Sequence, residues 1–409
     1  MIYTRRRMLA SVAGFCAVSG CLGSAGDSDR PLPDTPAGAW DQSGYNAQNT
    51  SAAGVSVPDR GTPAWSGGSG LITPLVVDGT VYTVDDALTA LNARTGERKW
   101  QTNLGIEASP NSATQPAVAD GYLLLASDSR VRSFSTADGS KRWERTIPGL
   151  PDQPTTVASD QQMGFTFFER PEQSAHPTEL VAFGTETGET RWTAQLQALS
   201  APLAVFDDHV YVAGWSGPET HVLRCLRLDD GEPVWERETE DLKTPPVSTD
   251  VGVIIGDGTD IDIYAHSDGQ RLASIGVSLG QIRALAFDNG TAFVLADSGL
   301  SSVSVPNGNV RWSRSGEEGY AQADGLAVGR ETVVAPVFAE SPDSSPSIAA
   351  FDTTDGTRRW HYAIDDGWSP TIASPPVLAD GAVFVMTNTR TGVTALGDLP
   401  PRTEATDSF

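Results

Sequence analysis

Short apolar segments alternate with tight polar turns along most of the chain. The first clear unit has an apolar segment at 75–77 and an alternating segment at 81–84, joined by Asp78-Gly79. A second hairpin follows over residues 88–100. Asp-Gly favours a tight hairpin because both of its residues tolerate positive φ angles. Two hairpins in series predict a four-stranded antiparallel sheet.

This unit recurs with a glycine in its second turn and a tryptophan four residues later. Six pairs keep that spacing: Gly96 with Trp100, Gly139 with Trp143, Gly188 with Trp192, Gly231 with Trp235, Gly308 with Trp312 and Gly356 with Trp360. In a seventh pair, Gly269 is followed by Ala273. Successive glycines lie 43, 49, 43, 38, 39 and 48 residues apart. A period near 40 residues with four strands per repeat is typical of a β-propeller.

The number of repeats predicts how the ring closes. First hairpins begin at eight places, but only seven glycine units follow them, and the last repeat ends near residue 396 without an outer strand. The segment Pro63-Ala64-Trp65-Ser66, before the first hairpin, has the composition of that strand. We therefore expect an all-β, eight-bladed propeller of four-stranded antiparallel blades over residues 39–399, closed by an N-terminal strand, which leaves no exposed sheet edge at the junction.

The recurring tryptophans are expected to pack one blade against the next, because each large ring buries about 150–250 Å² at a contact. A platform on which a ligand stacks is the alternative interpretation. The residues expected to dock blades are Trp65, Trp100, Trp143, Trp192, Trp235, Trp312 and Trp360.

The N-terminal residues are typical of an export signal. Arg5 and Arg6 fit a twin-arginine signal in residues 1–20, and Val18-Ser19-Gly20-Cys21 resembles a lipobox with Cys21 as the lipidated residue. A signal peptide with no lipidation is the alternative. Residues 21–38, rich in Gly, Ser, Asp and Pro, predict a disordered tether, and residues 400–409 a disordered tail. The expected location is the outer, extracytoplasmic face of the cell membrane.

Charge and cysteine content narrow the possible partners and environment. The net charge is −24, and without residues 1–20 it is −27. Only three lysines occur, and an acidic, lysine-poor surface is typical of a halophilic protein. This charge argues against nucleic acid as a partner, since such binding needs a basic patch. With Cys21 assigned to the lipid, Cys225 is the one cysteine left in the mature domain, so no internal disulfide is expected.

One face of the ring carries the longer loops. Insertions fall in the loops between the second and third strands and in the crossings between blades, and aromatic residues occur there among acids: Trp215, Tyr320 and Trp368. Insertions that cluster on one face often mark a binding surface. Variable, solvated loops without a partner are the alternative.

The repeat resembles the tryptophan-docking motif of the pyrroloquinoline-quinone (PQQ)-like propellers, as in Ala90-x-Asn92-x-x-Thr95-Gly96-x-x-x-Trp100. Residues 40–50 resemble the leader that precedes such repeats in haloarchaeal and bacterial members. That superfamily includes quinoprotein alcohol dehydrogenases and BamB-like lipoproteins. The resemblance implies the propeller fold over about residues 60–399 and, for a lipoprotein, membrane anchoring. The role of BamB requires an outer membrane, so the resemblance does not by itself carry that role to this chain.

The sequence lacks the motifs that would indicate a catalytic site, a metal site or a quinone site. Gly214-Trp215-Ser216-Gly217-Pro218 fails the nucleophile-elbow pattern, and the five histidines are scattered without a metal-binding spacing. The vicinal cysteine pair that quinoprotein dehydrogenases carry has no counterpart. Two glycosylation sequons begin at Asn49 and Asn289.

These observations favour a non-catalytic, monomeric scaffold that binds an unidentified protein or peptide partner, without a cofactor or metal. Two alternatives stay open. One is a dehydrogenase-like enzyme that uses PQQ and calcium, and the other is a propeller that binds a small ligand or glycan in its central channel.

Overall fold

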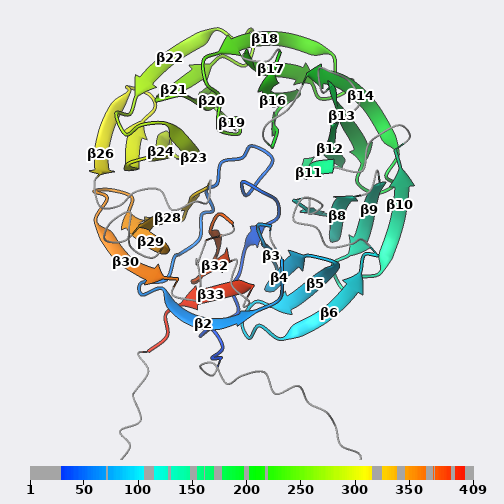
Figure 1. Ribbon diagram of the computed structural model, residues 1–409, viewed down its shortest axis with the longest axis vertical. Helices are drawn as coiled ribbons and strands as arrows, with labels where there is room; N and C mark the ends of the chain where they lie inside the picture. Colours follow the sequence, from blue (N-terminus) through cyan, green and yellow to red (C-terminus); the bar gives the residue numbers. More distant parts are fainter. Residues whose placement is uncertain are drawn as a thin grey trace, which may run out of the picture.

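A computed structural model describes most of the chain. The described residues are 29–70, 72–105, 115–127, 130–147, 154–160, 162–169, 177–197, 202–216, 220–315, 325–338, 346–364, 372, 374–387 and 392–400. Eight antiparallel sheets surround a central axis, as Figure 1 shows. The predicted all-β, eight-bladed propeller is confirmed.

The blades follow the chain order. Blade 1 contains β3 (Leu75–Val77), β4 (Thr80–Val84), β5 (Ala87–Asn92) and β6 (Arg98–Asn103). Blade 2 contains β7 (Ala117–Ala119), β8 (Tyr122–Ser127), β9 (Arg130–Ser135) and β10 (Lys141–Thr146). Blade 3 contains β11 (Pro154–Asp160), β12 (Met163–Glu169), β13 (Pro177–Gly184) and β14 (Thr190–Gln197). Blade 4 contains β15 (Ala204–Phe206), β16 (His209–Trp215), β17 (His221–Arg227) and β18 (Pro233–Thr239).

The other four blades repeat this order. Blade 5 contains β19 (Val247–Thr249), β20 (Gly252–Asp257), β21 (Asp260–Tyr264) and β22 (Arg271–Gly276). Blade 6 contains β23 (Ile282–Asp288), β24 (Thr291–Ala296), β25 (Gly299–Ser304) and β26 (Asn309–Ser315). Blade 7 contains β27 (Ala327–Val328), β28 (Thr332–Phe338), β29 (Pro346–Asp352) and β30 (Arg358–Ala363). Blade 8 contains β31 (Val377–Ala379), β32 (Ala382–Met386), β33 (Val393–Gly397) and β2 (Thr62–Gly67).

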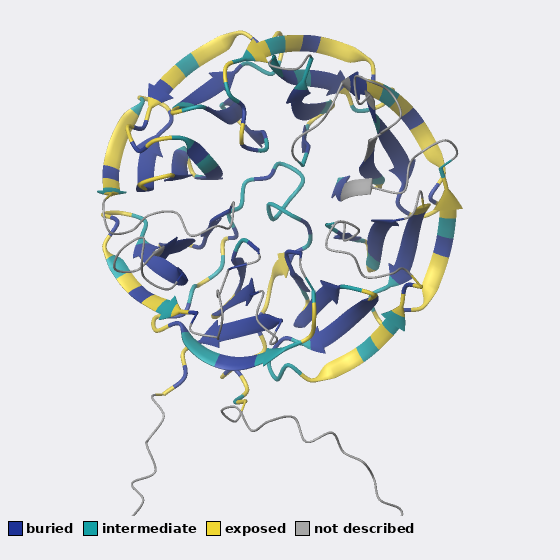
Figure 2. Cartoon of the chain, viewed as in Figure 1, coloured by how far each residue is buried: buried dark blue, intermediate teal, exposed yellow. Residues whose placement is uncertain are grey.

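Burial follows the position of a strand in its blade. The inner three strands are mostly buried, whereas the outermost strands alternate between buried and exposed residues (Figure 2). On β10, for example, Trp143 is 7% exposed between the exposed Arg142 and the partly exposed Glu144. The core therefore lies between neighbouring blades.

Ring closure occurs where the sequence predicted it. Strand β2 pairs with β33 in antiparallel register, with Thr62 opposite Gly397 and Gly67 opposite Val393. Trp65, on β2, is 2% exposed and donates from Nε1 to the carbonyl oxygen of Ala93 in blade 1, at 3.1 Å. The two ends of the repeat array are thus joined by a ladder and by a tryptophan.

Each tryptophan docks on a glycine of the next blade. A side chain at Gly96 would place its Cβ 2.7 Å from the ring of Trp65, and one at Gly356 would lie 2.6 Å from Trp312. Both glycines have φ angles above +70°, which side chains disfavour. The seven indoles donate to backbone carbonyls at 2.6–3.1 Å; the acceptors are Ala93, Thr136, Thr185, Leu228, His266, Thr353 and Pro58.

At the seam between blades 5 and 6, no tryptophan docks on the glycine. Ala273 stands where the tryptophan would be, and Ile275 packs against Gly308, at 3.6 Å from the position of a Cβ there. Ile275, Phe287 and Val305 belong to one buried cluster across this seam. Aliphatic packing therefore substitutes for the indole and its hydrogen bond.

Part of the predicted tether is ordered. Among residues 29–38, Leu32 is 1% exposed and donates its N–H to Arg94, while Arg30 donates its N–H to Ala64 and a guanidinium N–H to Pro400. Apolar burial of Leu32 against blades 1 and 8 outweighs the flexible composition, so disorder predicted for 21–38 does not extend over 29–38. Residues 1–28 and 401–409, including Arg5, Arg6 and Cys21, lie outside the described residues. The part of the chain that the structure describes holds no helix able to cross a bilayer.

Replacing Trp65 by Ala should destabilise the ring by about 3–5 kcal/mol, because a large buried side chain is lost at the closure. Trp65→Phe should cost less, on the order of 1 kcal/mol for the lost hydrogen bond plus some packing. Chemical denaturation measures both. A loss for Trp65→Ala as small as that for Val310→Ala, at a 45% exposed position, would contradict the closure role.

Introducing the missing tryptophan should stabilise the protein. Ala273→Trp would face Gly308, which Ile275 now contacts, and with a rearrangement of Ile275 we expect a gain of about 1–2 kcal/mol. The melting temperature should rise by about 1–3 °C, because the entropy of unfolding of so large a ring is high. Leu272→Trp is the control, since residue 272 is 55% exposed. A decrease for Ala273→Trp would mean that the aliphatic packing of this seam cannot rearrange.

Candidate functional site

The centre of the ring is occupied by the chain itself. Residues 37–56, here named the hub segment, cross the axis and appear as the blue loop in the middle of Figure 1. Within it, β1 (Ala39–Trp40) pairs with β3, and Trp40 is 1% exposed and packs against Tyr45, at 5.2 Å between ring centroids. This segment includes the leader motif found in the sequence.

The hub segment is hydrogen-bonded to all eight blades. Blade 1 pairs with β1. Backbone N–H groups at or beside the inner strands of the other blades donate to it at 2.6–2.9 Å: Val118 to Asp41, Ser159 to the side-chain oxygen of Gln42, Val205 to Ala47, Ser248 to Gln48, Phe287 to Thr50, Val328 to Ser51 and Gly381 to Ser56. The inner edges of the sheets are thereby satisfied by one continuous segment.

Asn49 anchors the middle of the hub segment. Its side chain is 6% exposed, and Nδ2 donates to the carbonyl oxygens of Leu203 at 2.8 Å and Pro246 at 3.1 Å. The sequon at Asn49 is therefore buried, because the same amide nitrogen that would carry a glycan holds blades 4 and 5. A sequence motif alone does not distinguish an accessible asparagine from an anchoring one.

One central cavity has a volume of about 60 Å³, and an open hollow of about 400 Å³, lined by Asp41, Asp120 and Asp160 among others, lies between the hub segment and blades 1 to 3. Neither contains a cationic side chain among its described residues. The described residues that line the smaller cavity are uncharged: Trp40, Ser43, Gly44, Asn49, Ser51, Thr73, Pro202, Pro245, Val247, Ala284, Leu285, Gly325 and Pro375. PQQ carries three carboxylates and would need cationic partners and a pocket of roughly 300 Å³ or more. Neither described lining fits this cofactor. Nor do the described residues contain a cluster of His, Cys, Asp or Glu that could hold a metal ion.

The long-loop face is described only in part. Trp215, at the end of β16, is half-buried and lies edge-on to His221, at 5.4 Å. His221 accepts a hydrogen bond at Nδ1 from the N–H of Leu242, and Asp241 pairs with Lys243 at 2.8 Å. Tyr320 and Trp368 lie outside the described residues, so their proximity to Trp215 stays a prediction.

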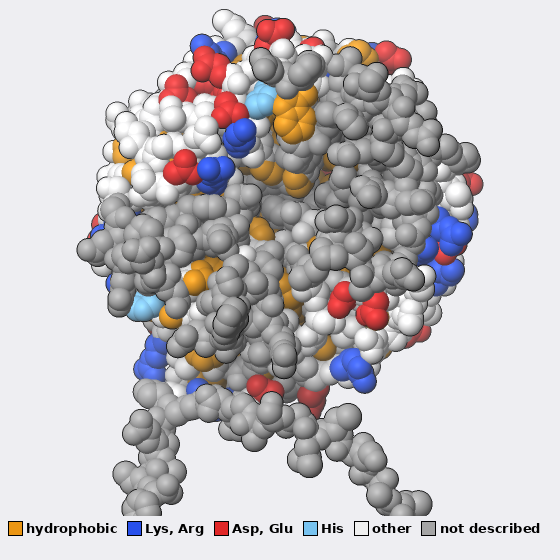
Figure 3. Space-filling model, viewed as in Figure 1, with side chains coloured by type: hydrophobic (Ala, Val, Ile, Leu, Met, Phe, Trp, Pro, Cys, Tyr) orange, Lys and Arg blue, Asp and Glu red, His pale blue; other side chains and the backbone are white. Residues whose placement is uncertain are grey.

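Charged side chains of both signs gather on the face that Figure 3 shows, over the region where Figure 1 places β20–β24. An aromatic residue beside paired acids and bases can supply contact area and orientation to a partner. Of the three aromatic residues predicted for this face, only Trp215 has a described setting, and its ring is already partly used by His221.

Asp41 introduces a partly buried carboxyl into the hub segment. Burial raises its pKa from 3.8 to about 6, although its own backbone N–H partly offsets this. Burial of the Tyr45 side chain, together with the charge of Asp41, raises the pKa of Tyr45. Because the folded-state pKa of Asp41 exceeds the unfolded one, folding takes up a proton between pH 4 and 6, and the free energy of unfolding should increase as the pH falls through this window.

Asp41→Asn should therefore stabilise the protein at pH 7–8, by about 3 kcal/mol at most, with the gain vanishing toward pH 4. Denaturation of both proteins across this pH range measures the effect. The exposed Asp34→Asn is the control for the removal of one negative charge. A loss of stability at pH 8 in the Asp41 variant would mean that the carboxylate makes a favourable contact there.

The chain was compared with known proteins. The family model described as "Outer membrane protein assembly factor BamB" matches residues 49–164 and 174–399. A BamB of Burkholderia pseudomallei (strain K96243) is 26% identical over 179 residues, covering 42% of each chain. The serine/threonine-protein kinase AfsK of Streptomyces griseus is 31% identical over 151 residues, or 35% of this chain and 18% of the kinase. The matches thus span less than half the length of either relative.

Solved structures share the fold at low sequence identity. The quinohemoprotein alcohol dehydrogenase of Comamonas testosteroni superposes with a TM-score of 0.64 at 13% identity, over 89% of this chain and 82% of the enzyme. BamB of Moraxella catarrhalis superposes with a TM-score of 0.57 at 11% identity, over 82% of this chain and 98% of that one. Because the family model covers most of the repeats, the chain belongs to the family of BamB-like PQQ-type propellers.

Proposed function

We propose that this chain is a non-catalytic scaffold that binds a protein partner while anchored by a lipid at the outer face of a cell membrane. The observation that carries the proposal is the hub segment, which bonds to every blade and uses up the centre of the ring. Because the hub segment occupies the axis, the specific contacts with a protein belong on the faces and the circumference of the ring.

The family supports a binding role. The name of the matching family describes an assembly factor, and the B. pseudomallei relative carries the same description. The quinohemoprotein dehydrogenase shares only the fold, and the described linings of the two central cavities offer no cation to a tricarboxylate quinone. Export through the twin-arginine signal and lipidation at Cys21 are the parts of the proposal that rest on sequence motifs alone.

The proposal places the partner on the long-loop face around Trp215. That face contains the longest loops, and loops on a rigid scaffold commonly carry binding residues. The opposite face consists of short glycine turns, whose backbone is committed to docking tryptophans. A photo-crosslinking residue on each face can therefore separate the two.

A photo-crosslinker at Thr220, on the long-loop face, should trap a protein in native membranes, whereas one at the exposed Asn307, in the glycine turn of blade 6, should not. Mass spectrometry of the crosslinked band identifies the neighbour. Cys21→Ser should release the protein from the membrane fraction and remove the crosslink. The matched positions control for expression and for general proximity to the membrane.

Two results would contradict the proposal. One is the absence of a crosslinked protein from either face in membranes that retain the anchored chain. The other is a quinone absorbance in the purified protein together with dye reduction by alcohols or sugars after PQQ and calcium are added, which would establish the dehydrogenase alternative. A ligand that raises the melting temperature without any protein crosslink would instead favour a small-ligand or glycan role.

A further inference from the structure

Positive charge is concentrated on the circumference of the ring. The eight outermost strands (β2, β6, β10, β14, β18, β22, β26 and β30) contain three acidic residues, Glu144, Glu236 and Glu238, although the chain has 52 Asp and Glu. The same strands contain twelve of its 28 basic residues: Arg98, Lys99, Lys141, Arg142, Arg145, Arg191, Arg237, Arg271, Arg311, Arg314, Arg358 and Arg359. The acidic character of the protein thus resides elsewhere, in turns and loops.

Blade 2 is the most basic part of this circumference. Residues 130–146 include five basic and two acidic residues. In Figure 3, basic side chains gather at the right-hand edge, where Figure 1 has β9 and β10. A short anionic segment that reaches this blade would meet local positive charge, despite the negative charge of the whole chain.

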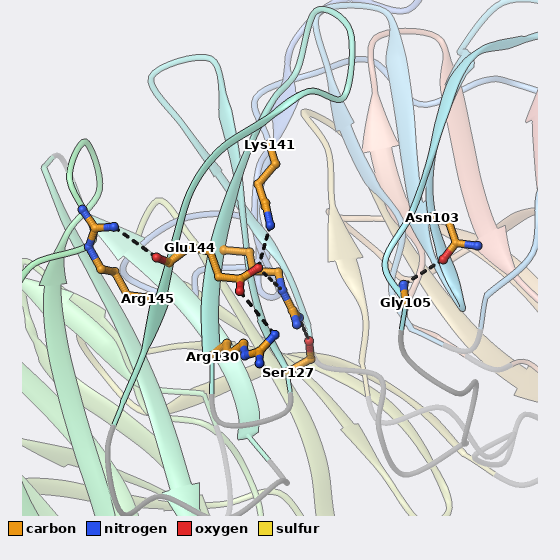
Figure 4. Close-up of polar contacts among 8 residues, drawn as sticks. Asn103, Gly105, Ser127, Arg130, Lys141, Glu144 and Arg145 are labelled. Atoms are coloured by element: carbon orange, nitrogen blue, oxygen red, sulfur yellow. Dashed lines mark hydrogen bonds and ion pairs between the residues drawn. The ribbon is translucent and has the colours of Figure 1, made fainter.

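Glu144 holds three of these cations in place, as Figure 4 shows. Its carboxylate oxygens lie 3.3 Å from Arg130, 3.2 Å from Arg132 and 2.8 Å from Lys141. The hydrogen bond from Lys141 and the charge of Arg132 lower the pKa of Glu144. One carboxylate against three cations leaves excess positive charge at fixed positions, with Arg130 and Lys141 about half exposed.

A pocket of about 270 Å³ lies on the other side of β10, between blades 2 and 3, and its lining includes the carboxyl groups of Asp120 and Glu186 as well as two guanidiniums. Arg142 lines it, with its guanidinium carbon 4.0 Å above the centre of the Tyr122 ring. Stacking on an aromatic ring holds a guanidinium in one orientation and leaves its N–H edge available. Gly184 lines the same pocket from blade 3 and keeps the space open.

Arg191 lines the pocket from blade 3. Its Nε and Nη2 atoms lie 3.5 Å from the position that a Cβ of Gly184 would take. Among the described residues, no acid or carbonyl oxygen pairs with its guanidinium. The equivalent Lys99 and Arg359 are instead bonded to Thr80 and Thr332 of their own blades.

Glu186 indicates which group the pocket accepts. Its side chain is 80% exposed, and Oε1 lies 3.5 Å from Nη2 of Arg142. The carboxylate of Glu186 thus contacts the guanidinium of Arg142 only at a long distance and remains exposed to solvent. An ion pair of this kind contributes little free energy. A carboxylate supplied from outside could replace it and meet Arg142 and Arg191 together.

We propose that this pocket binds a carboxylate of an acidic, extended peptide segment of a partner protein, and that the segment lies along β10. The proposal goes beyond the scaffold function, since it needs neither the lipid anchor nor the long-loop face. Strand β10 is the edge of its sheet, and none of the described strands pairs with its outer backbone edge, which is the side where a strand can be added. Arginine pairs with carboxylates through two parallel hydrogen bonds.

Screening favours a short peptide over a nucleic acid. At physiological ionic strength, the interaction between two charges more than about 8 Å apart is largely screened. A short segment bound at blade 2 therefore interacts mainly with the charges of that blade. A nucleic acid that extends beyond blade 2 would meet the acidic turns of its neighbours. The pocket, with two guanidiniums at one seam, also offers places for one or two carboxylates and no continuous basic track.

The test is a titration of the purified propeller with a short labelled peptide of alternating Glu and Thr, followed by fluorescence anisotropy at the lowest salt that keeps the protein folded. Arg142→Gln with Arg191→Gln should weaken binding by about tenfold or more. Arg98→Gln with Arg311→Gln removes the same charge from blades 1 and 6 and should change it by less than about twofold. Glu186→Gln should strengthen binding, since the internal competitor is gone.

Each outcome decides the proposal. Saturable binding with the pattern above supports it, and melting curves confirm that every variant folds. Absence of saturable binding to the unaltered protein overturns it, as does an equal loss in the Arg98 and Arg311 variant, which would indicate diffuse attraction. An oligonucleotide that binds as tightly and loses affinity in the same variants would overturn the choice of a peptide. None of these results depends on whether a partner is crosslinked at the long-loop face.

Discussion

An indole can lie flat against the next blade only where that blade presents backbone without a side chain. The glycine of each second turn meets this requirement, and its positive φ angle also bends the chain into the turn. The indole N–H then reaches a carbonyl oxygen that the turn leaves unpaired, so packing and hydrogen bonding act together at one place. Repetition of this contact fixes the angle between neighbouring sheets and leads to a closed ring.

A closed ring of sheets has an inner edge that needs hydrogen-bond partners. The hub segment supplies them from one polar stretch, and Gln42 and Asn49 extend its reach where the backbone is too distant. In consequence the blades are held twice, by tryptophans at seven of the eight seams and by one segment at the axis. A centre bound in this way provides rigidity, and binding chemistry is left to the loops and the circumference.

Periodic features, including the N-terminal strand that closes the ring, could be predicted from the sequence, whereas the contacts at the axis and between side chains of neighbouring blades could not. Asp-Gly turns and the tryptophan spacing are local, so the blades and the role of Trp65 followed from them. The path of residues 37–56 leaves no such pattern, because its contacts use backbone carbonyls, which every residue has. Similarly, Arg142 and Arg191 are far apart in the chain, and only the packing of blades 2 and 3 brings them to one pocket.

Two blades depart from the common repeat and make the ring asymmetric. Blade 5 exchanges its tryptophan for Ala273 and compensates with aliphatic packing, a change confined to the stability of one seam. Blade 2 departs in charge, since its outer strand keeps the docking Trp143 but surrounds it with cations. Docking uses the ring and the turn glycine alone, so the neighbouring positions are free to vary without loss of the fold. The net charge of −24 describes the whole chain and does not reveal differences between blades. Because charges are screened beyond about 8 Å, a partner interacts mainly with the charged side chains close to its binding site.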